Sequence, residues 1–187
     1  MDDYIYILAI LGGFLAGVIN TLAGSGSLIT LPILIFLGLP AYVANGTNRL
    51  GVVLQTIVSV FTLYKRGNLE LKGSVWLIVP AILGAIPGAY IAVDLSDQVL
   101  KNIIGAVMII MLIPLIMNAD KWLRESSEEG GRHKRWHVVA TFVLIGAYGG
   151  FLQAGVGIML LSGMVLLAGF TIRRANGLKN LIVLCFS

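Results

Sequence analysis

The sequence predicts an all-α integral membrane protein made of two homologous helical repeats, the second of them incomplete. Of the 187 residues, 58% are hydrophobic and only 12% are charged, whereas about a quarter of a soluble domain is charged. The apolar runs are long and do not alternate with polar residues. Such runs indicate helices rather than strands, because lipid leaves no backbone group unpaired and a spanning helix needs about 20 apolar residues. The repeats follow from a polar signature that occurs twice.

The repeated signature combines a glycine-rich tetrad with an asparagine-rich heptad. The first copy is AGSG at 23–26, Gly38 and ANGTNRL at 44–50, and the second is AGVG at 154–157, Gly169 and ANGLKNL at 175–181. Every matched pair is separated by 131 positions (154 − 23 = 175 − 44 = 131), so the copies align without a gap. In a chain this hydrophobic, duplicated halves with interrupted helices are typical of transporters that form a site near the bilayer midplane.

The first repeat, residues 1–118, is expected to hold five helices. The amino terminus is acidic and lacks the basic region of a cleaved signal peptide, so its first helix is expected to be retained. A short second helix follows the glycine tetrad, and the third contains the asparagine-rich heptad. Two further apolar runs complete the repeat. The five ranges are 4–23, 27–37, 41–64, 74–93 and 97–118.

A polar cytoplasmic loop at 119–135 is predicted to separate this repeat from the second, residues 136–187. The second repeat is expected to hold helices at 136–153, 158–168 and from 172 onward. At 1.5 Å per residue, a short helix of about a dozen residues covers roughly 18 Å of a hydrocarbon core about 30 Å thick. The short helices are therefore expected to be half-helices, re-entrant segments or spans completed by polar flanks.

Loop charges favour short helices that cross the membrane. Lysines and arginines near 65–72 and in 119–135 mark both loops as cytoplasmic. If the short helices cross, the acidic amino terminus lies outside and Arg173 and Arg174 lie inside; if they return to their own side, both assignments reverse. Crossing places five segments in the first repeat, which predicts an inverted second repeat. By the same count the chain is a fragment, or needs helices from a homo-oligomer or a partner.

The first candidate site is the glycine break before each short helix. Glycine lets the backbone turn and approach a ligand, and a helix N-terminus offers unpaired N–H groups at the positive end of its dipole. Such a position suits an anion. The alternative is that these small residues only allow close helix packing. The residues are Gly24, Ser25, Gly26, Ser27, Gly155 and Gly157.

The second candidate site is the polar heptad inside the third and last helices. Each copy places one cation in an apolar helix, where a charge costs about 2.5 kcal/mol or more. Arg49 and Lys179 are therefore expected to face a wet cavity and a bound anion or, in the alternative, to extend to lipid headgroups. The remaining residues of this site are Asn45, Thr47, Asn48, Asn176 and Asn180.

Other polar residues are expected to have structural roles. Interhelical hydrogen bonding is the expected role of Gln55, Thr56 and Ser59 on the third helix. The lone Cys185 belongs to no metal-ligand cluster, so neither a metal nor a cofactor is expected. The net charge of +4 is explained by loop topology rather than by nucleic-acid binding. Both histidines, His133 and His137, lie near the loop between the repeats, which leaves a serine nucleophile without a base.

Several of these residues resemble the signatures of a known family. They are GFLAG at 13–17, NTLAGSG at 20–26, LP at 31–32, GLP at 38–40 and ANGTNR at 44–49, followed by GGF at 149–151 and AGVG at 154–157. They are similar to the TauE/SafE sulfite-exporter family over nearly all of the chain. The resemblance implies a multipass plasma-membrane protein that moves small sulfur-containing anions such as sulfite or sulfonates. Family members are typically longer at the carboxyl end.

The resulting expectation is a transporter, and not an enzyme, that passes such an anion between inverted repeats. Export is favoured, because moving a monoanion out of a cell that is negative inside gains about 2.3 kcal/mol per 100 mV. Two alternatives stay open. One is an assembly subunit that does not transport, and the other is an intramembrane enzyme that uses the serine of the first break.

Overall fold

The structure is a computed structural model that describes residues 3–22, 24–69, 74–116 and 135–187, with side chains from residue 10 onward and up to residue 111 in the third range. Every regular element in these ranges is helical, which confirms the all-α prediction. The predicted loop at 119–135, His133 included, lies outside the described residues except for Arg135. The division into two repeats separated by that loop stays a prediction.

The helices follow the ranges expected from the sequence to within a few residues. They are α1 (Asp3–Leu22), α2 (Ser27–Phe36), α3 (Ala41–Lys65), α4 (Val75–Asp94), α5 (Asp97–Ile116), α7 (Arg135–Phe151), α8 (Val156–Ser162) and α9 (Ile172–Phe186). The largest difference concerns α8, which ends early and continues as a single π-helical turn, η1 (Gly163–Leu167). Together α8 and η1 fill the range predicted for one short helix.

Each short helix is bounded by glycines in the left-handed region of φ. The φ angle is 80° at Gly24 and 71° at Gly155, before α2 and α8, and 89° at Gly38 and 69° at Gly169, after them. Residues with a Cβ atom rarely adopt such angles. Both pairs are related by the offset of 131, so the same backbone turns occur at matching places in the two copies.

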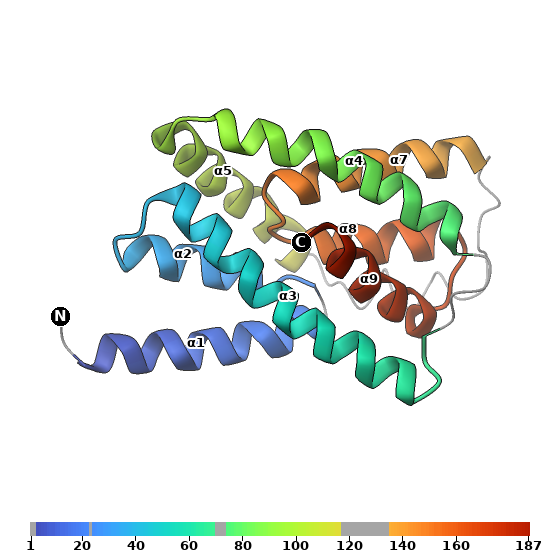
Figure 1. Cartoon of the computed structure of the whole chain (residues 1–187), viewed down its shortest axis with the longest axis horizontal. Coiled ribbons are helices and arrows are strands. Elements are labelled where there is room, and N and C mark those ends of the chain that lie inside the picture. The colour runs from blue at the N-terminus through green and yellow to red at the C-terminus, as the bar shows by residue number, and fades with distance from the viewer. Residues whose placement is uncertain (1–2, 23, 70–73, 117–134) are drawn as a thin grey trace.

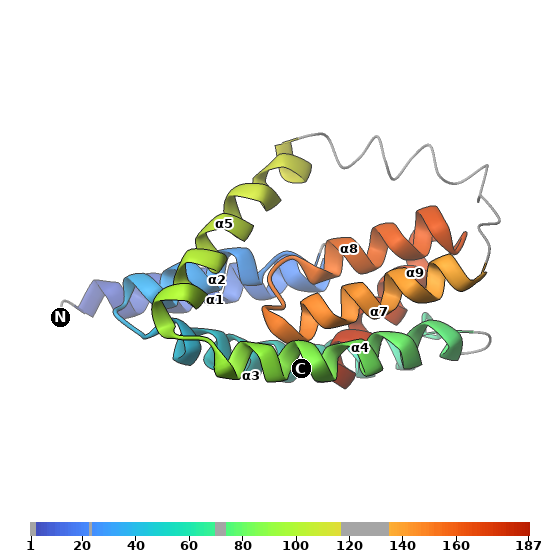
Figure 2. The same ribbon diagram turned by 90° about the horizontal axis from the view of Figure 1, so that it is seen from above.

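The helices of the two copies run in opposite directions along the long axis of the molecule. In Figure 1, α1 runs from the N-terminal end to the middle, α2 returns to that end, and α3 then runs toward the far end. Helix α7 enters from the far end, α8 returns to it, and α9 runs back toward the middle. Figure 2 shows the same opposition of α1–α2 and α7–α8 from above. The glycine turns of the two helix pairs thus meet near the centre.

The basic residues at three helix ends lie together at one end of the molecule. Lys65 ends α3, Arg135 begins α7, and Arg173 and Arg174 lie in the first turn of α9. All three of these helix ends lie on the right in Figure 1. The turn between α4 and α5, where Asp94 ends its helix, lies at the opposite end with the amino terminus.

Helices α4 and α7 pack against each other through glycines. A Cβ atom at Gly84 or Gly88 would lie 2.0 or 1.9 Å from a carbonyl oxygen of α7, and one at Gly146 or Gly150 would lie 2.0 Å from a carbonyl oxygen of α4. Only glycine permits this approach, and small residues spaced four apart are typical of helix contacts in lipid. This contact joins the helices on either side of the predicted loop at 119–135.

The outer surface is rich in large apolar side chains. Phe14, Leu54, Leu83 and Ile109, on four different helices, are each 60–70% exposed. Among the described residues, α4 alone is both long and apolar enough to cross a membrane, and shorter apolar helices occupy Ile10–Leu22, Ser27–Phe36 and Val156–Leu167. Extended apolar surface of this kind marks contact with a partner or with lipid.

Candidate functional site

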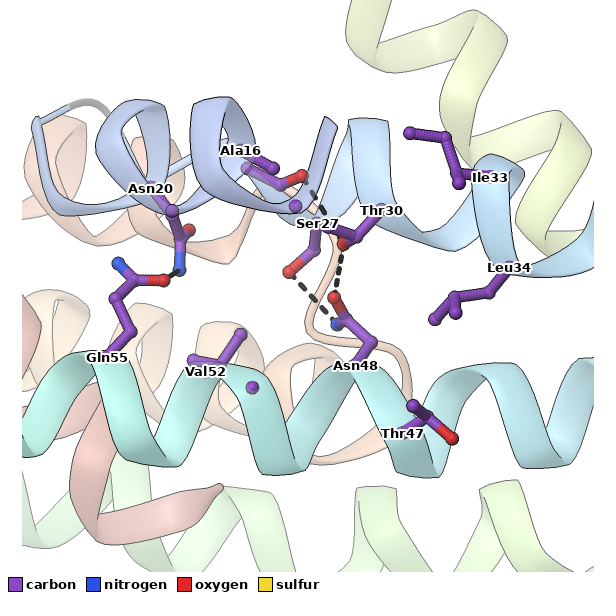
Figure 3. Close-up of a pocket in the computed structure, with 14 residues that line it drawn as sticks. Ala16, Asn20, Ser27, Thr30, Ile33, Leu34, Thr47, Asn48, Val52 and Gln55 are labelled. Carbon is purple, nitrogen blue, oxygen red and sulfur yellow. Dashed lines mark hydrogen bonds between the residues drawn. The ribbon is translucent and has the colours of Figure 1, made fainter. Parts of the chain in front are cut away.

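A cavity of about 260 Å³ lies between α1, α2 and α3 (Figure 3). Its walls are uncharged, and glycines and small side chains leave the space open. Six polar side chains from the three helices line it together with these small residues. They are Asn20, Ser27, Thr30, Thr47, Asn48 and Gln55. The site residues Ser27, Thr47 and Asn48 are therefore brought together, although the Thr47 side chain is largely exposed.

Asn48 connects α3 to α2 through a buried hydrogen-bond network. Its Nδ2 donates to Ser27 Oγ at 3.1 Å, and Thr30 Oγ1 donates to Asn48 Oδ1. Ser27 and Thr30 are three positions apart on α2, so both face α3. Asn48 and Ser27 are only 5% and 3% exposed. The network places two hydroxyls and an amide on the cavity wall, as Figure 3 shows.

A second network connects α3 to α1. Asn20 Nδ2 donates to Gln55 Oε1 at 3.1 Å, and Gln55 Nε2 donates to Thr21 Oγ1 at 2.8 Å. The interhelical role expected of Gln55 is confirmed. Thr56 differs, because its hydroxyl donates to Val52 O within α3 at 2.7 Å. Ser59 Oγ is buried without a partner among the described residues.

The two glycine breaks contact each other backbone to backbone. The N–H of Gly157 donates to Gly24 O at 3.2 Å, and a Cβ atom on either glycine would lie 2.3 Å from the other's Cα. Gly26 packs against α1, where a Cβ atom would lie 2.0 Å from Ala16 O. Ser25 is buried, and Gly155 lies beside Met111. The backbone donor of Gly157 is thus used within the protein.

A second, water-sized cavity of about 10 Å³ lies where the breaks meet. It shares Asn20, Ser27 and Val52 with the larger cavity, so the two adjoin. Residues of both predicted repeats line it, whereas the larger cavity is lined only by residues 13–55. They are Asn20, Gly24, Ser27, Val52, Thr56, Gln153, Val156, Gly157, Lys179, Asn180 and Val183.

Lys179 lies at this cavity with its ammonium on the C-terminal end of α1. Its Nζ donates to three consecutive carbonyl oxygens, those of Asn20 at 3.3 Å, Thr21 at 3.0 Å and Leu22 at 3.5 Å. The side chain is 1% exposed. These contacts contradict the alternative in which Lys179 extends to lipid headgroups. They also place a cation at the negative end of a helix dipole, which is favourable.

Arg49, on α3, contacts the C-terminal end of α7, just as Lys179, on α9, contacts the C-terminal end of α1. Its guanidinium donates to the carbonyl oxygens of Gly149, at 3.4 Å, and Gly150, near the C-terminal end of α7. Asn45 Nδ2 donates to Phe151 O at 3.3 Å, at the same helix end. Thus a side chain of α3 binds the end of α7, and one of α9 binds the end of α1. In the part of the chain that the structure describes, neither cation has a carboxylate partner.

The other asparagines of the predicted site, Asn45, Asn176 and Asn180, do not line the larger cavity. Asn180 is buried, lines the small cavity and donates to Asn176 O at 2.9 Å. The Oδ1 atoms of Asn176 and Asn45 are buried and have no partner among the described residues. The structure therefore brings Ser27, Lys179 and Asn180 to one place, and it does not bring Arg49 or Asn176 to either cavity lining.

Sequence reasoning missed three polar residues of these cavities, Asn20, Thr30 and Gln153. Asn20 and Thr30 lie on the cavity faces of α1 and α2. Gln153 lies in the second break with φ 65°, and its Oε1 has no partner in the described ranges. A signal for Thr30 was present, since it lies three positions after Ser27. Asn20 and Gln153 end or follow apolar runs, where a polar residue ordinarily indicates only the edge of a helix.

The comparisons with known proteins agree on one family. The family model described as sulfite exporter TauE/SafE matches residues 9–187. A probable membrane transporter protein, ORF9, of a Sinorhizobium species is 30% identical over 184 residues, which cover 94% of this chain and 67% of that protein. One from Haemophilus influenzae is 29% identical, with 94% and 69% covered. One from Methanocaldococcus jannaschii is 27% identical, with 90% and 64% covered. No solved structure matches this chain.

Proposed function

We propose a transport function for this chain, which belongs to the TauE/SafE sulfite exporter family. The members of the family that it matches are named probable membrane transporters. In this proposal, the chain is a multipass protein that carries small anions of the sulfite or organosulfonate class across the plasma membrane. One observation carries the proposal. Lys179 is a buried cation without a described carboxylate partner, and it lines a small cavity that adjoins a larger polar one.

The two cavities supply a polar route toward this positive charge. In the larger cavity, Asn20, Asn48 and Gln55 each use one amide N–H within the protein and keep a second for a passing anion, and the Ser27 hydroxyl is a further donor. Ligand pockets for drug-sized molecules measure about 300–1,000 Å³. A volume of about 260 Å³ therefore suits a small ion. Cavity walls without carboxylates also avoid repelling an anion.

The proposal includes two inverted repeats that share the site. It is supported by the constant offset of 131, the opposite helix directions and the contact between the glycine breaks. The grouping of basic helix ends at one end of the molecule supports a cytoplasmic face there. The electrical potential then favours export of a monoanion from a cell that is negative inside.

Flux measurements on the purified protein in proteoliposomes test this function. Sulfite, a short sulfonate such as methanesulfonate, and sulfate are compared with and without a pH gradient, against empty liposomes. We expect electrogenic flux of at least one monoanion that follows an imposed membrane potential. A correctly reconstituted protein that moves none of these anions, or that copurifies with an obligate partner and moves them only with it, would overturn the proposal of an autonomous anion transporter.

Substituting Asn48 by leucine tests whether the larger cavity lies on the route. The change keeps the number and branching of side-chain heavy atoms but removes the hydrogen bonds to Ser27 and Thr30 and an amide from the cavity wall. A hydrogen bond contributes about 0.5–1.5 kcal/mol, so flux is expected to fall about tenfold. The matched control is Asn102→Leu, at an exposed position of α5. Equal flux in the two variants would remove this cavity from the route.

A further inference from the structure

The three carbonyl oxygens that hold Lys179 have the arrangement of a cation site. They come from consecutive residues, Asn20, Thr21 and Leu22, at the C-terminal end of α1, just before the break at Gly24. All three point at one atom, the ammonium nitrogen. Carbonyl oxygens at the ends of broken helices are the groups that coordinate Na⁺ in membrane carriers with interrupted helices.

We propose that this carbonyl group is an alkali-cation site that the ammonium of Lys179 occupies as a tethered cation. The ammonium lies 3.0–3.5 Å from the three oxygens, and its side chain is 1% exposed, so no free ion shares the position. A dissociable Na⁺ is therefore not needed to hold the end of α1 in place. Coupling to Na⁺ at this position is excluded while Lys179 is present.

The surroundings of Lys179 fit a site that accepts a free cation once the side chain is shortened. The adjoining small cavity already has the size of one water molecule, and hydroxyls of Ser27 and Thr56 line it. Gln153 adds a buried Oε1 that has no partner among the described residues and lines the same cavity. Removing the lysine stem enlarges this space and leaves the carbonyl oxygens without a donor. Unpaired buried carbonyls favour a cation or water in its place.

Arg49 provides an internal comparison at the other helix end. Its guanidinium is planar and half-buried, and it contacts carbonyls of Gly149 and Gly150 rather than three consecutive ones. Asn45 already donates to the next carbonyl, that of Phe151. Shortening Arg49 therefore leaves fewer free oxygens, and this end is not expected to bind an alkali cation.

The test compares the thermal stability of the wild type and Lys179→Ala in detergent with NaCl, KCl or choline chloride at equal ionic strength. For Lys179→Ala we expect NaCl or KCl to raise the melting temperature by about 3 °C or more over choline chloride. The wild type, Arg49→Ala and the exposed-lysine variant Lys65→Ala are expected to show no such difference. Transport plays no part in this measurement, so its result is independent of the anion that the protein carries.

Each outcome decides the proposal. A melting temperature of Lys179→Ala that is equal in all three salts overturns it, and so does a cation effect of equal size in the wild type. If Lys179→Ala cannot be recovered in choline chloride, recovery in NaCl or KCl supports the site, and failure in all three salts overturns it. Lys179→Ser, measured in the same way, repeats the test with a small polar side chain.

Discussion

Gly157→Ala is expected to lower the melting temperature by about 6–12 °C and to abolish transport. The added Cβ would lie 2.3 Å from Gly24 Cα and 2.8 Å from Gly24 O, both backbone atoms that cannot rotate away. Overpacking ordinarily costs about 1–3 kcal/mol, and a backbone clash belongs at the upper limit. For a chain of this length, each kcal/mol corresponds to about 2–4 °C.

Gly105→Ala is the matched control for this variant. It also adds one methyl group to a helical glycine, but nothing lies within 4 Å of the added atom. Alanine is a better helix former than glycine by about 1 kcal/mol, so the melting temperature is expected to stay the same or to rise. Both are measured by thermal unfolding in detergent. Equal stability of the two variants would contradict the contact between the breaks.

Lys179→Gln is expected to reduce anion flux about 10- to 150-fold while the protein remains folded. Hydrogen bonds to charged groups contribute about 1.5–3 kcal/mol, and the substitution removes the charge that the anion is proposed to sense. The amide of glutamine can still donate to the carbonyls that Lys179 contacts, which keeps the end of α1 paired. Initial rates of uptake into proteoliposomes, at saturating and at low anion concentration, measure the effect.

Lys65→Gln serves as the control because it removes the same charge from an exposed position. Lys65 ends α3, and its ammonium lies 4.4 Å from the ring centre of Phe61. Its flux is expected to stay within twofold of the wild type. If Lys179→Gln also transports at the wild-type rate, the buried ammonium has a structural role only, and the proposed anion site is wrong.

The helix positions could be predicted because glycines and charged residues mark the ends of the apolar runs. Gly24, Gly38, Gly155 and Gly169 bound the short helices, and each takes a positive φ. The partners of the buried Lys179 and the half-buried Arg49 could not be predicted. Their positions inside apolar helices left only two expected environments for Arg49 and Lys179, a wet cavity or the lipid headgroups. In the structure both side chains instead donate to carbonyl oxygens at helix ends. Those acceptors belong to the backbone, which carries no residue-specific signal.

The site itself was predicted only in part, for a related reason. Ser27, Asn48 and Lys179 were expected from their motifs and do line cavities. The glycine break was expected to offer free N–H groups, and the N–H of Gly157 is instead taken by Gly24 O. Contacts between segments more than a hundred residues apart depend on how the repeats dock. One copy of the signature does not reveal which atoms of the other it will meet.

The contact of Lys179 with the C-terminal end of α1 affects the order in which contacts form while the chain is synthesised. The contact at the C-terminal end of α1 cannot form until Lys179 has been synthesised, 157 residues after Leu22. At about 5–20 residues per second, a ribosome needs about 8–30 s to cover that distance. During this interval the carbonyls of α1 have no ammonium to bind. The nascent first helix therefore remains open to water, to lipid headgroups or to a membrane chaperone until α9 is made.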